Sequence, residues 1–112
     1  MKVYLAGKIR GLPQFGREAF RKGAAELRSA GHEVFCPAEN TERLYGAAVY
    51  EADHGDEEAA GIDRRLVFGL DLDWICRHAE VVALLPGWET SPGATAERAV
   101  ALALDLQIWE LA

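Results

Sequence analysis

The stretch VVALLPGWETSPGATAE, residues 81–97, decides the fold that this sequence predicts. It begins with a run of apolar residues at 81–85, which indicates a short buried strand, and a proline-glycine pair then ends that strand. The residues SPG at 91–93 predict the start of a helix, with the serine as N-cap and the proline as the first helical residue. A strand followed by a loop and a helix is one unit of an α/β sheet.

The rest of the chain repeats this alternation. Further strands are expected at 2–6, 33–36 and 107–111, and further helices from Pro13 to Ala30 and over about 62–78. Alternating elements predict a parallel sheet with helices on both faces, and right-handed crossovers favour a flavodoxin-like strand order 2-1-3-4. We therefore expect a single α/β domain over 1–112, a Rossmann-like three-layer sandwich.

Residues 38–60 interrupt the alternation. They are acidic and rich in turn-forming residues, and they predict a variable loop with a short helix around 42–52. Long loops in compact domains are often lids or binding loops, but a solvated insertion explains the same composition equally well.

Composition restricts the class of partner. The net charge of −6 argues against duplex nucleic acid and against an anionic membrane, because both attract basic surfaces. No apolar run approaches the length of a membrane span. Cys36 and Cys76 fit neither a metal-ligand spacing nor a disulfide framework, so a reduced, cytoplasmic location is expected.

The predicted strand order also predicts where a ligand binds. Ligands of open α/β sheets bind beyond the carboxyl ends of the strands, at the point where the strand order reverses. That point lies between the first and third strands, which are followed by the loops GKIRG at 7–11 and PGWETSPG at 86–93. The candidate substrate- and phosphate-binding residues in these loops are Gly7, Lys8, Arg10, Trp88, Ser91 and Gly93.

Each candidate has a structural alternative. The first-turn amides after Ser91 would suit an anion such as phosphate, but an ordinary capped helix has the same sequence. Arg10 could clamp a phosphate through two hydrogen bonds, and Lys8 could contact it as a point charge, yet most single cations are solvated. Trp88 could stack on a base or belong to the core.

Two carboxylates complete the set of candidates. Glu97 lies on an almost wholly apolar helix, where an unpaired charge is costly, so it needs either an ion-pair partner or a chemical role. Asp71 and Asp73 lie two residues apart on the helix predicted at 62–78, so they face different directions and at most one can reach the site. Nothing in the pattern indicates a metal.

Three segments in the correct order resemble the nucleoside 2-deoxyribosyltransferase superfamily: YLAGKIRG at 4–11, DLDWICRHAEVVALLPG at 71–87 and SPGATAE at 91–97. They are most similar to its nucleoside 5′-monophosphate N-glycosidase branch, which includes deoxynucleotide and cytidylate hydrolases. The resemblance covers 1–36 and 69–111. Lys8 departs from it, since a phosphate-binding serine is frequent there, and Arg98-Ala99 replace a small apolar residue and a glycine.

The resemblance implies a role for each matching position. The nucleophilic glutamate falls on Glu97, the aspartate that protonates or orients the leaving base on Asp71, and the first-strand tyrosine beside the nucleophile on Tyr4. The phosphate-binding serine falls on Ser91, and the phosphate-binding arginine on Arg10. The transferases have an aspartate in place of Ser91, so the monophosphate hydrolases are the better match.

These roles imply a glycosidase mechanism without a metal or redox cofactor. Glu97 would capture the oxocarbenium-like sugar, and Asp71 would supply a proton to the base, so the pKa of Asp71 should be raised relative to that of Glu97. The expected reaction is hydrolysis of a nucleoside or 2′-deoxynucleoside 5′-monophosphate to free base and sugar 5-phosphate. The alternatives are a 2-deoxyribosyltransferase and a non-catalytic nucleotide-binding module. Since relatives in this superfamily assemble, we also expect a homodimer or a larger assembly.

Overall fold

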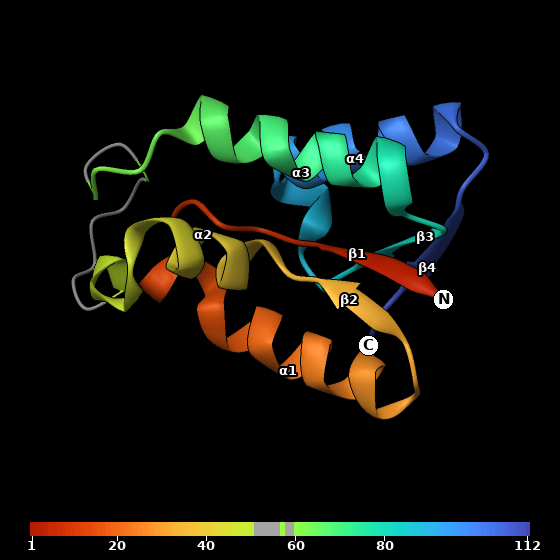
Figure 1. Ribbon diagram of the computed structural model, residues 1–112, viewed down its shortest axis with the longest axis horizontal. Coiled ribbons are helices and arrows are strands. Elements are labelled where there is room, and N and C mark those ends of the chain that lie inside the picture. The colour runs from red at the N-terminus through yellow and green to blue at the C-terminus, as the bar shows by residue number, and fades with distance from the viewer. Residues whose placement is uncertain (51–56, 58–59) are drawn as a thin grey trace.

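The protein forms a three-layer α/β sandwich around a parallel sheet (Figure 1). The computed structural model describes residues 1–50, 57 and 60–112. The strands are ordered β2-β1-β3-β4, and they comprise β1 (Lys2–Ala6), β2 (Glu33–Phe35), β3 (Val81–Leu84) and β4 (Gln107–Glu110). Both the fold class and the strand order predicted from the sequence are confirmed.

The helices cover both faces of this sheet (Figure 1). On one face α1 (Arg17–Ser29) packs through Phe20, Ala24 and Leu27 against Val3 and Leu5 of β1. On the other face α3 (Arg64–His78) and α4 (Pro92–Ala103) cover a second apolar cluster. Successive side chains of a strand point to opposite faces, so Tyr4, between Val3 and Leu5, points to the α3–α4 layer.

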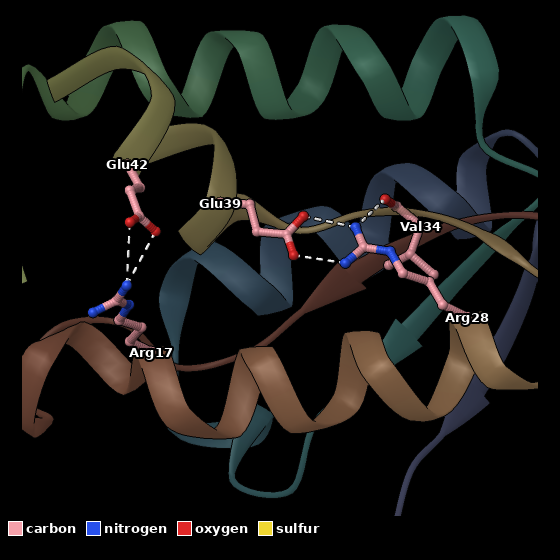
Figure 2. Close-up of polar contacts among 5 residues, drawn as sticks. All are labelled: Arg17, Arg28, Val34, Glu39 and Glu42. Carbon is pink, nitrogen blue, oxygen red and sulfur yellow. Dashed lines mark hydrogen bonds and ion pairs between the residues drawn. The ribbon is translucent and has the colours of Figure 1, made fainter. Parts of the chain in front are cut away.

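A shorter helix, α2 (Pro37–Tyr45), follows β2 and is tied to α1 by two ion pairs (Figure 2). The guanidinium of Arg28 donates two hydrogen bonds of 2.6 Å to the Glu39 carboxylate and one of 3.1 Å to the carbonyl of Val34. One nitrogen of Arg17 lies 3.2 Å from both oxygens of Glu42. These contacts hold α2 near the carboxyl ends of β1 and β2.

The predicted start of the first helix was wrong. The first helix does not begin at Pro13: a 3-10 turn, η1 (Pro13–Gly16), precedes α1, and Gln14 and Phe15 have φ angles of 51° and 55° in the left-handed region. This turn places Phe15 in a buried cluster with Ile62 and Val67, and that burial offsets the unfavourable backbone conformation.

The region 38–60 is also more regular than predicted. α2 begins at Pro37, which occupies the first helical turn instead of only ending the strand, and it ends at Tyr45. A 3-10 segment, η2 (Ala47–Tyr50), replaces the second half of the helix expected at 42–52. The remainder of that expected helix, at 51 and 52, lies outside the described residues.

Candidate active site

Three polar side chains meet inside the protein on the α3–α4 side of the sheet. Tyr4 of β1 is fully buried, and both Asp71 of α3 and Glu97 of α4 are only 5% exposed. The Tyr4 hydroxyl donates a hydrogen bond to Oε2 of Glu97, and hydrogen bonding from the same hydroxyl lowers the pKa of Asp71. Residues from three separate elements thus form one polar cluster, which includes every catalytic candidate that the sequence indicated.

Burial dominates the electrostatics of this cluster. Loss of hydration raises the pKa of Asp71 to about 7 and that of Glu97 to about 8, although hydrogen bonding from Tyr4 opposes both shifts. Burial also raises the pKa of Tyr4 well above its ordinary value, and the two neighbouring carboxylates add to that shift. The cluster therefore holds a proton at neutral pH, as acid–base chemistry requires.

The expected difference between these two groups stays a prediction. Burial is the largest cause at both positions and raises both pKa values, to about 7 for Asp71 and about 8 for Glu97, and the negative charge of Asp71 raises the pKa of Glu97 further. The two carboxyls therefore form one coupled pair.

The aspartate ambiguity is resolved by the geometry of α3. Asp71 points inward to Tyr4, while Asp73 is exposed and its Oδ1 accepts a hydrogen bond of 2.9 Å from Nε of Arg77 one turn later. The helix geometry thus confirms that only one of the two aspartates reaches the buried cluster.

Ser91 caps α4 as the sequence predicts. Its hydroxyl oxygen accepts a hydrogen bond of 3.2 Å from the backbone N–H of Ala94, and the side chain is buried. Proline occupies the first turn, and Gly93 follows in helical conformation. The positive end of the helix dipole therefore faces the space in front of Ser91 and Gly93.

Gly93 has no evident reason within the protein to be glycine. A Cβ built there would lie 3.9 Å from its nearest neighbours, the Phe68 ring and the Ser91 hydroxyl, and its φ is not positive. Gly7 differs, because a Cβ there would come within 2.8 Å of the Leu85 side chain. Packing explains Gly7, whereas Gly93 leaves room that a ligand could use.

A cavity of about 380 Å³ connects these features. Its wall includes the loop 7–10 after β1, the first turn of α4 and both carboxylates, Asp71 and Glu97. The volume is within the range of pockets that hold small ligands. Gly7, Lys8, Arg10, Ser91 and Gly93 all line it, so five of the six predicted binding residues lie together.

Trp88 is the predicted binding residue that lies apart from the cavity wall. It belongs to a 3-10 turn, η3 (Trp88–Thr90), and its Nε1 donates a hydrogen bond of 3.2 Å to Oε1 of Glu110 in β4. The guanidinium carbon of Arg98 lies 5.3 Å from the centre of the indole ring. These contacts explain Trp88 as a packing residue between η3, α4 and β4.

Sequence reasoning missed several residues of the cavity wall. α3 contributes Arg64, Val67 and Phe68, and Glu57 also lines the cavity. The signal was available for α3, because a crossover helix runs antiparallel to the strands and its first turns must lie at their carboxyl ends. No such rule places Glu57, which follows a stretch without regular pattern.

The described part of the chain offers two negative findings. Among its residues no group of three or more histidine, cysteine, aspartate or glutamate side chains is arranged to hold a metal ion. None of its helices is both long and apolar enough to cross a membrane.

Comparison with known proteins assigns a family but no activity. A family model described as "Domain of unknown function (DUF4406)" matches residues 1–110, so the chain belongs to this family. No curated protein matches the chain, and no solved structure matches it.

Proposed function

We propose that this member of the DUF4406 family is a nucleoside 5′-monophosphate N-glycosidase. It would hydrolyse a nucleoside or 2′-deoxynucleoside 5′-monophosphate to the free base and (deoxy)ribose 5-phosphate. The observation that carries the proposal is the buried cluster of Tyr4, Asp71 and Glu97, whose two carboxylates line a cavity together with a capped helix N-terminus and cations. The resemblance to the nucleoside 2-deoxyribosyltransferase superfamily assigns the same residues to the same roles.

Glu97 is the proposed nucleophile. Cleavage of an N-glycosidic bond builds positive charge on the sugar, and a carboxylate against the anomeric carbon stabilises that charge and captures it as a glycosyl ester. The low exposure of Glu97 strengthens this interaction, because little water screens it. Water then attacks the anomeric carbon and gives its proton to the Asp71 carboxylate left by departure of the base, which restores the Glu97 carboxylate and releases the sugar phosphate.

The proton for the leaving base is proposed to come from Asp71. A tyrosine hydroxyl has one hydrogen to donate, and in this protein Tyr4 donates it to Glu97. Burial raises the pKa of Asp71 to about 7, so a neutral Asp71 is available near neutral pH. A cationic sugar stabilises the ionised nucleophile and thereby favours the proton on Asp71.

The 5′-phosphate is proposed to lie against the first turn of α4. The N–H of Gly93 lies at the positive end of this helix, between Pro92, which has no N–H, and Ala94, whose N–H is bonded to the Ser91 hydroxyl. Lys8 and Arg10 lie in the wall of the same cavity. Binding energy from the phosphate would orient the sugar for attack.

The assembly is proposed to be a homodimer through the outer surface of α3. Leu66 and Leu70 are 50% and 37% exposed there, and nothing in the described chain lies within 4 Å of a Cβ built at Gly69 between them. A glycine inside a helix weakens it by about 0.5–1 kcal/mol relative to alanine, so close approach of a second helix would explain it. A two-fold pairing centred on Gly69 would place Arg65 opposite Asp73 of the partner subunit. A monomeric elution volume at working concentration would contradict the dimer.

The function is tested by incubating the protein with ribo- and deoxyribonucleoside 5′-monophosphates and with the unphosphorylated nucleosides. Chromatography should detect free base from one or more monophosphates and from none of the nucleosides. Base exchange on adding a second base would instead indicate a transferase. Binding without any release would indicate a nucleotide-binding module.

Gly93→Ala gives this assay a site-specific variant. Alanine is favourable in a helix and meets no protein atom closer than 3.9 Å, so the fold should be retained. Its methyl group would enter the phosphate position, so base release should fall about tenfold or more through weaker binding. Thr95→Ala, at an exposed position of the same helix that does not line the cavity, is the control for the chemistry.

A further inference from the structure

One aromatic side chain of the cavity wall lies outside the apolar core. The protein has four phenylalanines, and three of them, Phe15, Phe20 and Phe35, pack into the apolar clusters of the core. Phe68 of α3 is half-buried, and it belongs to none of the clusters that the described residues form. It lines the cavity instead, and among the described residues of the wall it is the one aromatic side chain. Packing in the core therefore does not explain why a large aromatic residue occupies position 68.

Helix geometry places Phe68 beside the proposed proton donor. Phe68 and Asp71 are three residues apart in α3, so they project from the same face of the helix, about 4.5 Å apart along its axis. Both side chains line the cavity. The ring of Phe68 also reaches the start of α4, because its Cε1 atom lies 3.9 Å from a Cβ built at Gly93. A nucleotide that extends from Gly93 to Asp71 therefore passes the Phe68 ring.

The sides of the cavity differ in chemistry. The loop after β1 presents charge, and Nε of its Arg10 lies 3.2 Å from Oε1 of Glu57, another residue of the wall. The first turns of α4 present glycine and alanine. α3 contributes a charged residue at each end of its part of the wall and, between them, the apolar side chains of Val67 and Phe68. A flat base matches this apolar part of α3 best, because every base has a π face that can stack on an aromatic ring.

We propose that Phe68 is a substrate-binding residue whose ring stacks on the base of the nucleotide, so that the site holds an intact nucleotide more tightly than the sugar phosphate product. The inference rests on the proposed function for the positions of the phosphate and the base. The sequence offered Trp88 as the residue that could stack on a base, but Trp88 lies apart from the cavity wall. Once the base has departed the stack is lost, and the sugar phosphate keeps only the contacts of its phosphate and sugar. The same ring therefore favours both binding of the substrate and release of the product.

Calorimetric titration of the full chain with nucleoside 5′-monophosphates and with ribose 5-phosphate tests this role. Glu97→Gln is the host protein, so that the nucleotides are not consumed during the titration. Phe68→Leu, added to this host, keeps an apolar side chain of high helix propensity and removes the aromatic face. Nucleotide binding should weaken about tenfold, which is within the range that base–aromatic stacking supplies. Binding of ribose 5-phosphate should be unchanged.

Two further variants of the host separate stacking from structural support. Phe68→Tyr retains the aromatic ring and should bind nucleotides as tightly as the host protein does. Trp109→Leu makes the same kind of change at a half-buried position of β4 outside the cavity wall, and it should alter neither affinity. If Phe68→Leu does not fold, Phe68→Met is judged by the same criteria.

Equal weakening of both ligands in Phe68→Leu would overturn the inference, since Phe68 would then support the phosphate position or the fold. Unchanged nucleotide binding would also overturn it, as would a Phe68→Tyr variant that binds no better than Phe68→Leu. Base release by the wild-type protein is measured separately, and release together with any of these results rejects this inference alone. Selective loss of nucleotide binding in a protein that releases no base rejects the proposed hydrolysis and leaves the stacking role. Absence of both release and nucleotide binding rejects both proposals.

Discussion

Two sets of carboxylates in this protein have opposite surroundings. Glu39 on α2 faces the guanidinium of Arg28, and hydrogen bonding from that guanidinium lowers the pKa of Glu39. Glu97 and Asp71 between the sheet and the α3–α4 layer share a tyrosine, and burial raises the pKa of both. Ionisation of Glu39 is favourable at neutral pH, whereas ionisation of Asp71 and Glu97 is unfavourable there.

The difference separates carboxylates that stabilise the fold from carboxylates that are available for chemistry. An exposed carboxylate with a cation gains a little free energy and has a fixed protonation state. A buried carboxylate with a hydroxyl partner lowers stability when ionised, and that unfavourable state is what a cationic transition state can relieve. The following variants test this distinction, from the largest expected effect to the smallest.

Glu97→Gln should give the largest effect. The amide cannot form the glycosyl ester, so base release should fall by on the order of 10³-fold or more. The variant should still fold, because the amide oxygen can accept the Tyr4 hydrogen bond. Glu26→Gln on the exposed surface of α1 is the control, and it should release base at the wild-type rate. Equal activity of the two variants would contradict the assignment of the nucleophile.

Asp71→Asn should reduce base release by about 10²- to 10⁴-fold, because the amide cannot supply a proton to the leaving base. Asp73→Asn makes the same substitution two residues later and removes only an exposed pair with Arg77. Its rate should match the wild type. A nucleotide whose synthetic leaving group departs without protonation should restore much of the rate of Asp71→Asn. If the role of Asp71 were only structural, this substrate would not restore the rate.

The pH dependence of stability should differ in sign between the two sets. In the unfolded chain Asp71 and Glu97 have their ordinary pKa values of 3.8 and 4.5. Between these values and about pH 8 the folded state therefore binds more protons than the unfolded state. The free energy of unfolding should therefore fall as pH rises through this window. Glu97→Gln should flatten that slope and be more stable than wild type at pH 8 by ~3 kcal/mol in denaturant titrations. An unchanged slope would contradict the raised pKa of Glu97.

Glu39→Gln should give the smallest effect and the opposite sign. The lowered pKa of Glu39 means that its contribution is present above its ordinary pKa of 4.5 and is lost as pH falls. Both side chains of the Arg28–Glu39 pair are nearly half exposed, so solvent screening limits the loss to about 1 kcal/mol or less at pH 7. High salt should reduce it further, and base release should be unaffected.

The fold could be predicted because alternation and handedness restrict the topology. Once β1, β3 and the helix after Ser91 were recognised, the order β2-β1-β3-β4 followed from right-handed crossovers. Topology did not indicate Tyr4: the family resemblance placed it beside Glu97, which is 93 positions away in the chain. The left-handed residues Gln14 and Phe15 could not be predicted, because their conformation follows from burial of Phe15 against distant residues.

The site could be predicted only where regular structure determined it. Ser91 and Gly93 follow from helix capping, and the inward direction of Asp71 follows from helix periodicity once one aspartate is chosen. The pairing of Glu57 with Arg10 depends on how an irregular segment packs, and no local pattern encodes it. The raised pKa values of Asp71 and Glu97 also follow from tertiary burial, which no local pattern encodes.

The leucine that abuts Gly7 also has a consequence for how this family can evolve. One methyl group of Leu85 would lie 2.8 Å from a Cβ at position 7, and the other would lie 3.0 Å from a Cβ at position 23 in α1. A single side chain thus fills the space that two missing side chains leave. These three positions form an epistatic unit, in which drift at one site is permitted only after change at another. Among homologues, we expect a larger residue at position 7 or 23 to occur only together with a smaller residue at position 85.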